Sequence, residues 1–247
     1  MAYDYVAWNP TRELLATIVS LLVYTAFYFL TTCTRRFEKS TTLAYTTAVE
    51  LVRVGLTVIG PAYYIQQWHG GDGTAIGLQA KSARAVGGAL VLQLLLAAFC
   101  WKGLQKTAKE KNLSSQSLAF HLVFNTLVIW EPFYCHGVLQ LIFARAFGSI
   151  AAVILTGVAH GAYHLGTYPI VGGTGQSCAS LAGFSCGFAG IYALGGHSLF
   201  VLCPLLWGVS CSIGTLEGGF VFTRDMCIAE AVADTVAVAS LSCLLLL

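Results

Sequence analysis

The stretch Asn125–Phe143, NTLVIWEPFYCHGVLQLIF, contains a single acidic side chain, Glu131, within sequence that is otherwise apolar enough to cross a membrane. An ionisable residue at such a depth costs about 3 kcal/mol on membrane-insertion scales and usually marks a functional site. The next apolar segment, Leu155–Gly166 with the sequence LTGVAHGAYHLG, carries His160 and His164. One acid and two histidines in neighbouring apolar segments indicate proton-transfer chemistry inside a membrane.

The composition agrees with a membrane protein. The chain has 247 residues, of which 57% are hydrophobic and 10% are charged, whereas soluble domains carry about 25% charged residues. The net charge of +2 is too small to indicate a nucleic-acid partner. The 9 cysteines form no CxxC pair and are predicted to be reduced core residues. We expect membrane lipids and a lipophilic small molecule or prenylated substrate as partners, and no cofactor.

Apolar stretches of about 20 residues have the length of a membrane-spanning helix. They predict an all-α, polytopic transmembrane helical bundle of about eight spans. Residues 1–247 are predicted to form a single integral membrane domain, with the active-site core at about 118–216, in the endoplasmic reticulum if the source is eukaryotic. Residues 172–177, GGTGQS, are predicted to be a loop. The predicted spans are Leu14–Thr32, Ala44–Ile65, Val86–Trp101, Leu118–Ala144, Ile150–Tyr168, Ala179–Leu194, Leu199–Leu216 and Ile228–Leu247.

Polar residues inside the predicted spans supply the candidate site. Pro132 follows Glu131, removes a backbone hydrogen bond and predicts a kink beside the acid. His160 and His164 are four residues apart and share a helical face, and His136 follows the proline. These groups converge if the fourth and fifth spans are antiparallel neighbours. In the second span, Glu50 and Arg53 are three residues apart and can pair on one helix face, either as a structural ion pair or as a wall of the polar cavity.

Three interpretations of this cluster remain open. Glu131 and His164 together could activate a water, or His160, His164 and Glu131 could hold a metal, or the histidines could hydrogen-bond to neighbouring helices. We favour the acid–base pair and predict no metal, because a lone HxxxH pattern is a weak metal signal. The catalytic candidates are Glu131, His164, His160 and His136, and the candidate substrate-lining aromatics are Trp130, Tyr134, Tyr163 and Trp207.

The fourth and fifth spans resemble the CAAX prenyl protease 2 family, the glutamate-type intramembrane proteases also called CPBP. That family carries two adjacent glutamates, then an arginine four residues after the second glutamate and usually a glycine. The run 131–137, EPFYCHG, matches the first glutamate and the glycine but has Pro132 and His136 at the other two positions. In the family's second motif, a phenylalanine lies four residues before a histidine. His164 matches that histidine, and His160 replaces the phenylalanine.

The resemblance covers about Asn125–Cys211, and its third motif departs most. A histidine four residues before an asparagine is expected there, and the best counterparts are Trp207 and Cys211. The resemblance implies that Glu131 and His164 form the water-activating pair. It also implies that the partners of the oxyanion are missing, a loss worth about 3 kcal/mol in an acyl-transfer transition state.

These features predict a diverged, non-proteolytic enzyme that protonates a prenyl or polyene substrate. Cyclisation, or hydration of an alkene or epoxide, needs an acid but no oxyanion hole, and aromatic faces stabilise a developing cation. The first alternative is a CAAX-type prenyl-protein or peptide endopeptidase. The second alternative is a non-catalytic membrane scaffold or immunity-type protein on the same fold.

Overall fold

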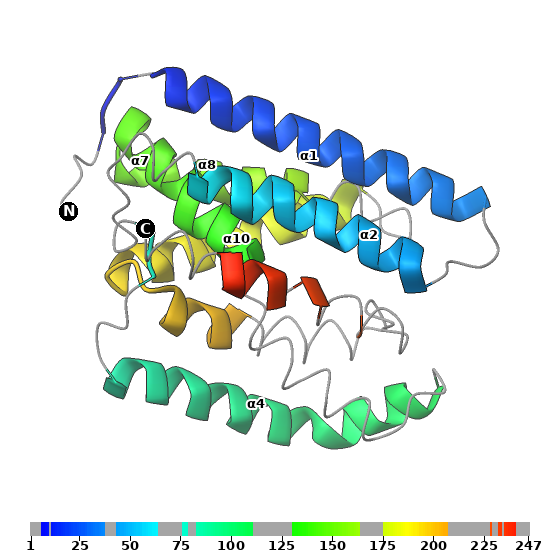
Figure 1. The fold of residues 1–247 in the computed structure, drawn as a ribbon. Helices are drawn as coiled ribbons and strands as arrows, with labels where there is room; N and C mark the ends of the chain where they lie inside the picture. The colour runs from blue at the N-terminus through cyan, green and yellow to red at the C-terminus, as the bar shows by residue number, and fades with distance from the viewer. Residues whose placement is uncertain are drawn as a thin grey trace.

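The computed structural model describes residues 6–9, 11–37, 43–63, 76–78, 83–110, 130–163, 175–206, 228, 232–233 and 235–240. Within these ranges every regular element is a helix, which confirms the all-α prediction for the described part of the chain (Figure 1). The elements are α1 (Arg12–Phe37), α2 (Leu43–Val54), η1 (Gly55–Ile59), α4 (Ala83–Glu110), α6 (Trp130–Pro132), η2 (Phe133–Leu139), α7 (Gln140–Phe147), α8 (Ser149–Tyr163) and α10 (Gly175–Leu194).

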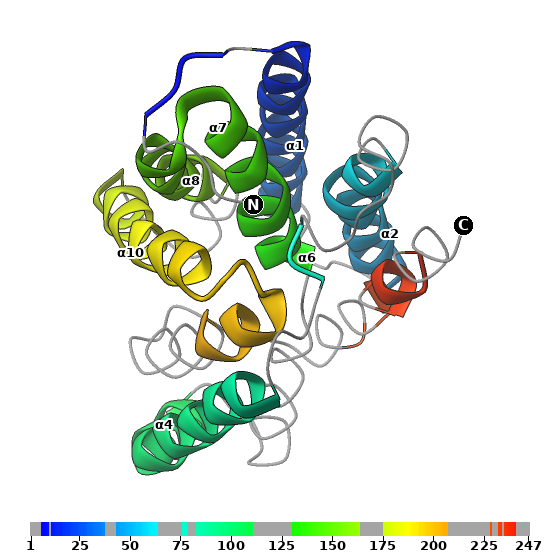
Figure 2. The same ribbon diagram turned by 90° about the vertical axis from the view of Figure 1, so that its left-hand side faces the viewer.

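The helices that carry the candidate site lie at the centre of the molecule. α8 packs between α7 and α10, and α1 contacts both α7 and α8. α4 lies on the opposite side of the molecule from α1 (Figures 1 and 2). Gly148, with a φ of 86°, turns the chain between α7 and α8, a conformation that a side chain would strain. α7 and α8 are therefore antiparallel neighbours, which is the arrangement that convergence of the polar groups requires.

Two helices in the described part of the chain are long and apolar enough to cross a membrane. They are Leu43–Tyr63, with 21 residues, and Ala83–Lys106, with 24 residues. Leu14–Phe27, Ser149–Tyr163 and Ala182–Leu194 are shorter apolar helices. Of the most apolar 18-residue stretch within Ala83–Lys106, only 11% is buried. The core helix of a soluble protein, by contrast, is mostly buried.

The surface of several helices is more apolar than the side that faces the core. On α8, Ile150, Ile154 and Val158 are 54%, 54% and 56% exposed, whereas Thr156 and His160 are buried. On α4, Phe99 is 88% exposed. Contiguous exposed apolar surface of this kind marks contact with lipid or with another protein.

Two π-helical segments occur next to prolines. The helix continues through Pro132 and takes the wider π form in η2, where the Gln140 N–H donates to the Cys135 carbonyl. In η1 the Gly60 N–H likewise donates a hydrogen bond to the carbonyl of Gly55, five residues earlier, and Pro61 follows directly. A proline cannot donate to the helical ladder, and π segments often accompany such interruptions at functional sites.

The predicted loop at 172–177 is wrong in its last residues, because α10 begins at Gly175. Glycine and serine have low helix propensity, but tertiary packing routinely overrides propensity. α10 makes its most extensive contact with α8. Residues 172–174 lie outside the described ranges.

Gly157 allows α8 and α10 to approach closely. A Cβ at this position would collide with Cys186 Sγ and would lie 2.7 Å from the Ala182 carbonyl oxygen. We expect Gly157→Ala to lower the free energy of unfolding by about 1–3 kcal/mol, because α10 would have to move outward. The measurement is denaturant titration of the purified protein in detergent.

The matched control is Gly183→Ala on α10, where a Cβ would meet nothing within 4 Å. That change should be neutral or stabilising by about 0.5–1 kcal/mol, since alanine is the better helix former. Equal stabilities for the two variants would contradict a backbone-to-backbone contact at Gly157.

Candidate functional site

The centre of the site is a hydrogen-bonded acid–histidine pair. Glu131 Oε1 lies 2.7 Å from His160 Nε2. Both residues are buried, with exposed fractions of 7% and 2%. Glu131 comes from α6 and His160 from α8, so the antiparallel packing of their helices brings together groups 29 residues apart. A contact this short between a carboxyl group and an imidazole is charge-assisted and favours proton sharing.

Ser185 of α10 completes a chain of three side chains. Its Oγ lies 2.7 Å from His160 Nδ1, and Ser185 is itself fully buried. Both ring nitrogens of His160 are therefore engaged, one by an acid and one by a hydroxyl group. The sequence interpretation missed Ser185; the available signal was a polar residue on the apolar helix GFSCGFAG, among glycines that permit close helix contact.

His136 lies beside this chain. Its ring meets the ring of His160 edge-on, with centroids 5.6 Å apart and an interplanar angle of 90°. η2 contributes to the placement, because the wider π turn between Glu131 and His136 brings His136 closer to the face that carries Glu131 than an α-helix would. In an ordinary α-helix His136 would point away from the side that carries Glu131. Glu131, His160 and His136 thus lie together, whereas His164, the fourth group expected in this cluster, lies outside the described residues.

Gln140 determines which nitrogen of His136 carries a proton. The Gln140 Nε2 group donates to the Ala189 carbonyl at 2.9 Å, so its Oε1 atom faces His136 Nδ1 at 3.4 Å. An amide oxygen only accepts, and His136 Nδ1 must therefore be the N–H donor in the neutral ring. His136 Nε2 is then an acceptor, and it has no hydrogen-bond partner among the residues that the structure describes.

Three tyrosines form a wall on the α1 side of the pair. Tyr24 stacks on Tyr163 with centroids 4.3 Å apart, and Tyr134 lies 6.2 Å from Tyr163. The centroid of the Tyr163 ring lies 6.1 Å from that of the His160 ring. The Tyr134 hydroxyl donates to Ser20 Oγ at 3.4 Å. Two of the four predicted substrate-lining aromatics, Tyr134 and Tyr163, therefore adjoin the site.

A buried ion pair lies in the neighbouring helix. Arg53 Nη1 is 3.1 Å from Glu50 Oε2, and both side chains are 8% exposed. The pairing predicted from their spacing is confirmed. η1, which directly follows this pair, contacts α6 and η2, so the pair supports the element that presents Glu131.

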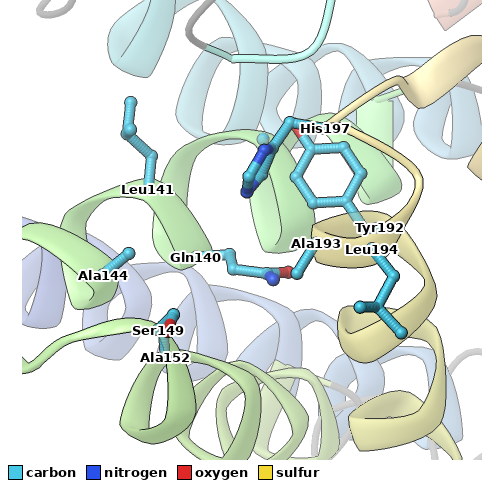
Figure 3. A pocket seen from close by; sticks show the side chains of 10 residues that line it. Gln140, Leu141, Ala144, Ser149, Ala152, Tyr192, Ala193, Leu194 and His197 are labelled. Carbon is cyan, nitrogen blue, oxygen red and sulfur yellow. The ribbon is translucent and has the colours of Figure 1, made fainter. Parts of the chain in front are cut away.

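A cavity of about 200 Å³ lies next to the site (Figure 3). Side chains from α7, α8 and α10 surround it. The rings of Tyr192 and His197 lie beside one another, with their centroids 5.2 Å apart. Glu131, His160 and Ser185 do not line it. Gln140 does, and it links the cavity to His136. The lining residues are Gly137, Gln140, Leu141, Ala144, Ser149, Ala152, Tyr192, Ala193, Leu194 and His197.

Some predicted site residues cannot be placed. His164, Trp207 and Cys211 lie outside the described residues, and for Trp130 only the backbone is described. The Glu131–His164 pair and the metal alternative that requires His164 therefore stay predictions. The structure pairs Glu131 with His160, the position where the resemblance implies a phenylalanine.

Comparison with known proteins adds no relative. No family model, curated protein or solved structure matches the chain.

Proposed function

We propose that the chain is a multi-pass membrane enzyme of about eight spans. In this proposal Glu131 and His160 move a proton on a lipophilic prenyl or polyene substrate, and the result is cyclisation or hydration of an alkene or epoxide. The observation that carries the proposal is the buried chain Glu131–His160–Ser185, in which each contact is 2.7 Å.

The arrangement suits general acid–base catalysis. A carboxyl group and an imidazole within hydrogen-bond distance can exchange a proton without solvent, and burial among apolar side chains keeps water away from a reactive cation. The adjoining ring of Tyr163 offers a π face that stabilises positive charge. Positioned proton donors of this kind contribute about 10²–10⁴-fold in rate.

The surface supports a lipophilic substrate. α4 and α8 expose isoleucine, valine, leucine and phenylalanine side chains, while Gln93 of α4 and Thr156 and His160 of α8 are buried. A protein with this distribution uses lipid as its solvent, and a substrate dissolved in the bilayer would approach through it. The multi-pass topology and the substrate class are parts of the same proposal.

Peptide hydrolysis is the second candidate, because an acid–histidine pair can also activate water. Its transition state places negative charge on the carbonyl oxygen and requires hydrogen-bond donors. His136 stands where the resemblance implies an arginine, and its Nε2 atom, which has no partner within the described ranges, accepts rather than donates. A neutral acceptor near the site suits a developing cation better than an oxyanion, so proton-initiated chemistry is favoured.

The test uses purified protein in lipid nanodiscs with farnesyl and geranylgeranyl alkenes and their terminal epoxides. We expect a cyclised isomer of unchanged mass or a product that has gained one water. In D₂O, protonation of an alkene carbon should place one deuterium in the product, whereas protonation of an epoxide oxygen should not. Mass spectrometry distinguishes these outcomes.

A farnesylated CAAX peptide provides the opposing arm of the same experiment. We expect no release of the terminal tripeptide. Efficient release that is lost in Glu131→Gln would overturn the proposal and establish the endopeptidase. No conversion of any of these substrates, by a protein that remains folded, would favour the non-catalytic scaffold.

A further inference from the structure

Ser185 is a polar side chain on the buried face of α10. Phe188, Ala189 and Tyr192 continue that face at helical spacing, and all are buried. Its neighbour Phe184 is exposed. A hydroxyl group in such a position requires a hydrogen-bond partner, and the partner is His160 Nδ1 at 2.7 Å.

The approach of α10 to α8 makes this contact possible. Gly157 lies three residues before His160 and packs directly against Ala182 and Cys186 of α10. Because Gly157 contributes no side chain, α10 packs closely on α8 at this level, and the short Ser185 side chain reaches the imidazole ring. Glycine at 157 and serine at 185 therefore act together to set the distance to His160.

We propose that Ser185 is a positioning residue that acts through His160. A hydroxyl group donates when Nδ1 lacks a proton and accepts when Nδ1 carries one. When Nε2 exchanges a proton with Glu131, Nδ1 keeps its own proton, because loss of both protons would leave an imidazolate. Ser185 Oγ therefore accepts from Nδ1 throughout this exchange and keeps Nε2 aimed at the carboxyl group. The effect on turnover rests on the proposed function, but the effect on the protonation of the ring does not.

The rival role for Ser185 is that of a nucleophile. A hydroxyl group, an imidazole and a carboxyl group in series form the arrangement that activates serine in acyl transfer. However, Ser185 lies well inside α10, whose backbone N–H groups are bound within the helix. They cannot form an oxyanion hole, and the hydroxyl group is fully buried. These observations favour the positioning role.

The experiment compares Ser185→Ala and Ser185→Thr with the control Thr156→Val. Thr156 is buried on α8 one turn before His160, and its hydroxyl group has no hydrogen-bond partner among the described residues. Thr156→Val therefore removes a buried hydroxyl group close to the site without removing a contact to His160. Thermal unfolding in detergent verifies that each variant is folded.

The first readout is the ¹⁵N NMR spectrum of histidine-labelled protein, in which the His160 signals are identified by their loss in His160→Gln. Nitrogen shifts report which ring nitrogen carries a proton. We expect Ser185→Ala to change the tautomer population of His160, Ser185→Thr to restore the original population, and Thr156→Val to leave it unchanged. An unchanged His160 spectrum in a folded Ser185→Ala variant would overturn the proposal, whether or not a substrate has been found.

The second readout is kinetic. We expect Ser185→Ala to lower kcat by about 10- to 100-fold, the factor that corresponds to one lost hydrogen bond to a charged group. It should also move the pH profile of kcat, whereas KM should change little. Ser185→Thr should recover most of kcat, and Thr156→Val should match the wild type.

A serine-directed fluorophosphonate probe separates the two roles of Ser185. We expect no adduct on the wild-type protein. A covalent adduct on Ser185 that disappears in Glu131→Gln would replace the positioning role with a nucleophile and would redirect the assay to acyl transfer. Normal ring protonation in Ser185→Ala together with unchanged kcat would leave Ser185 with a packing role only.

Discussion

Glu131→Gln is expected to abolish turnover while the protein remains folded. The amide keeps the shape of the carboxyl group and can still hydrogen-bond to His160, but it cannot exchange a proton at this site. Loss of a positioned acid or base costs about 10²–10⁴-fold in rate. The measurement is product formation from the prenyl substrate, together with the midpoint of thermal unfolding in detergent.

The matched control is Glu110→Gln, which makes the same chemical change at an exposed position at the end of α4. It should behave as the wild type in both measurements. Near wild-type turnover in Glu131→Gln would eliminate Glu131 as the acid or base. A large fall in the unfolding midpoint would instead point to a structural role for the carboxyl group.

Two double-mutant cycles identify the histidine that works with Glu131. The structure pairs Glu131 with His160, and the resemblance implies His164. If Glu131 and His160 act as one unit, the double variant Glu131→Gln/His160→Gln should be no slower than the worse single variant, because such effects are not additive. Non-additivity with His164→Ala alone would favour the pair that the resemblance implies.

The acid–histidine cluster could be recognised in the sequence, because an acid and two histidines in apolar segments are conspicuous. The contact partners could not, because they depend on how far α8 is shifted along its axis relative to α6 and α7. His160 and His164 share a helical face in any α-helix, and sequence spacing does not say which of them lies level with Glu131. Their relative height depends on the packing of α7 and α8 around Gly148 and on the close contact at Gly157.

The inward position of His136 was also beyond sequence reasoning. A spacing of five residues places two side chains on different faces of an α-helix, and only the π form of η2 brings His136 back toward the site. Pro132 signals an irregularity but does not reveal its form. Gln140, four residues after His136, offered a clearer signal, since side chains at this spacing meet on a helix.

The ion pair and the cavity show the same contrast. Glu50 and Arg53 were predicted correctly, because their contact is local and follows from a spacing of three residues. The cavity is bounded by residues from η2 to His197, and its lining depends on how several helices cross. Local contacts within one helix can therefore be derived from this sequence, whereas contacts between helices need the structure.

Arg53→Met is expected to destabilise the protein by about 3–5 kcal/mol, because it leaves the Glu50 carboxylate buried without its charge partner. The double variant Glu50→Leu/Arg53→Met removes both charges and should recover most of that loss, since a buried pair replaced by apolar side chains of similar size is often neutral. The measurement is the free energy of unfolding from denaturant titration in detergent.

Arg84→Met, on the exposed start of α4, is the matched control and should change the stability by less than about 1 kcal/mol. An equally small effect for Arg53→Met would contradict an energetic role for the buried pair. Because η1 contacts α6, loss of the pair should also loosen the element that holds Glu131. We therefore expect Arg53→Met to lower turnover, and the double variant to restore turnover and stability together. Recovery of stability without turnover would mean that the charges act on the substrate directly.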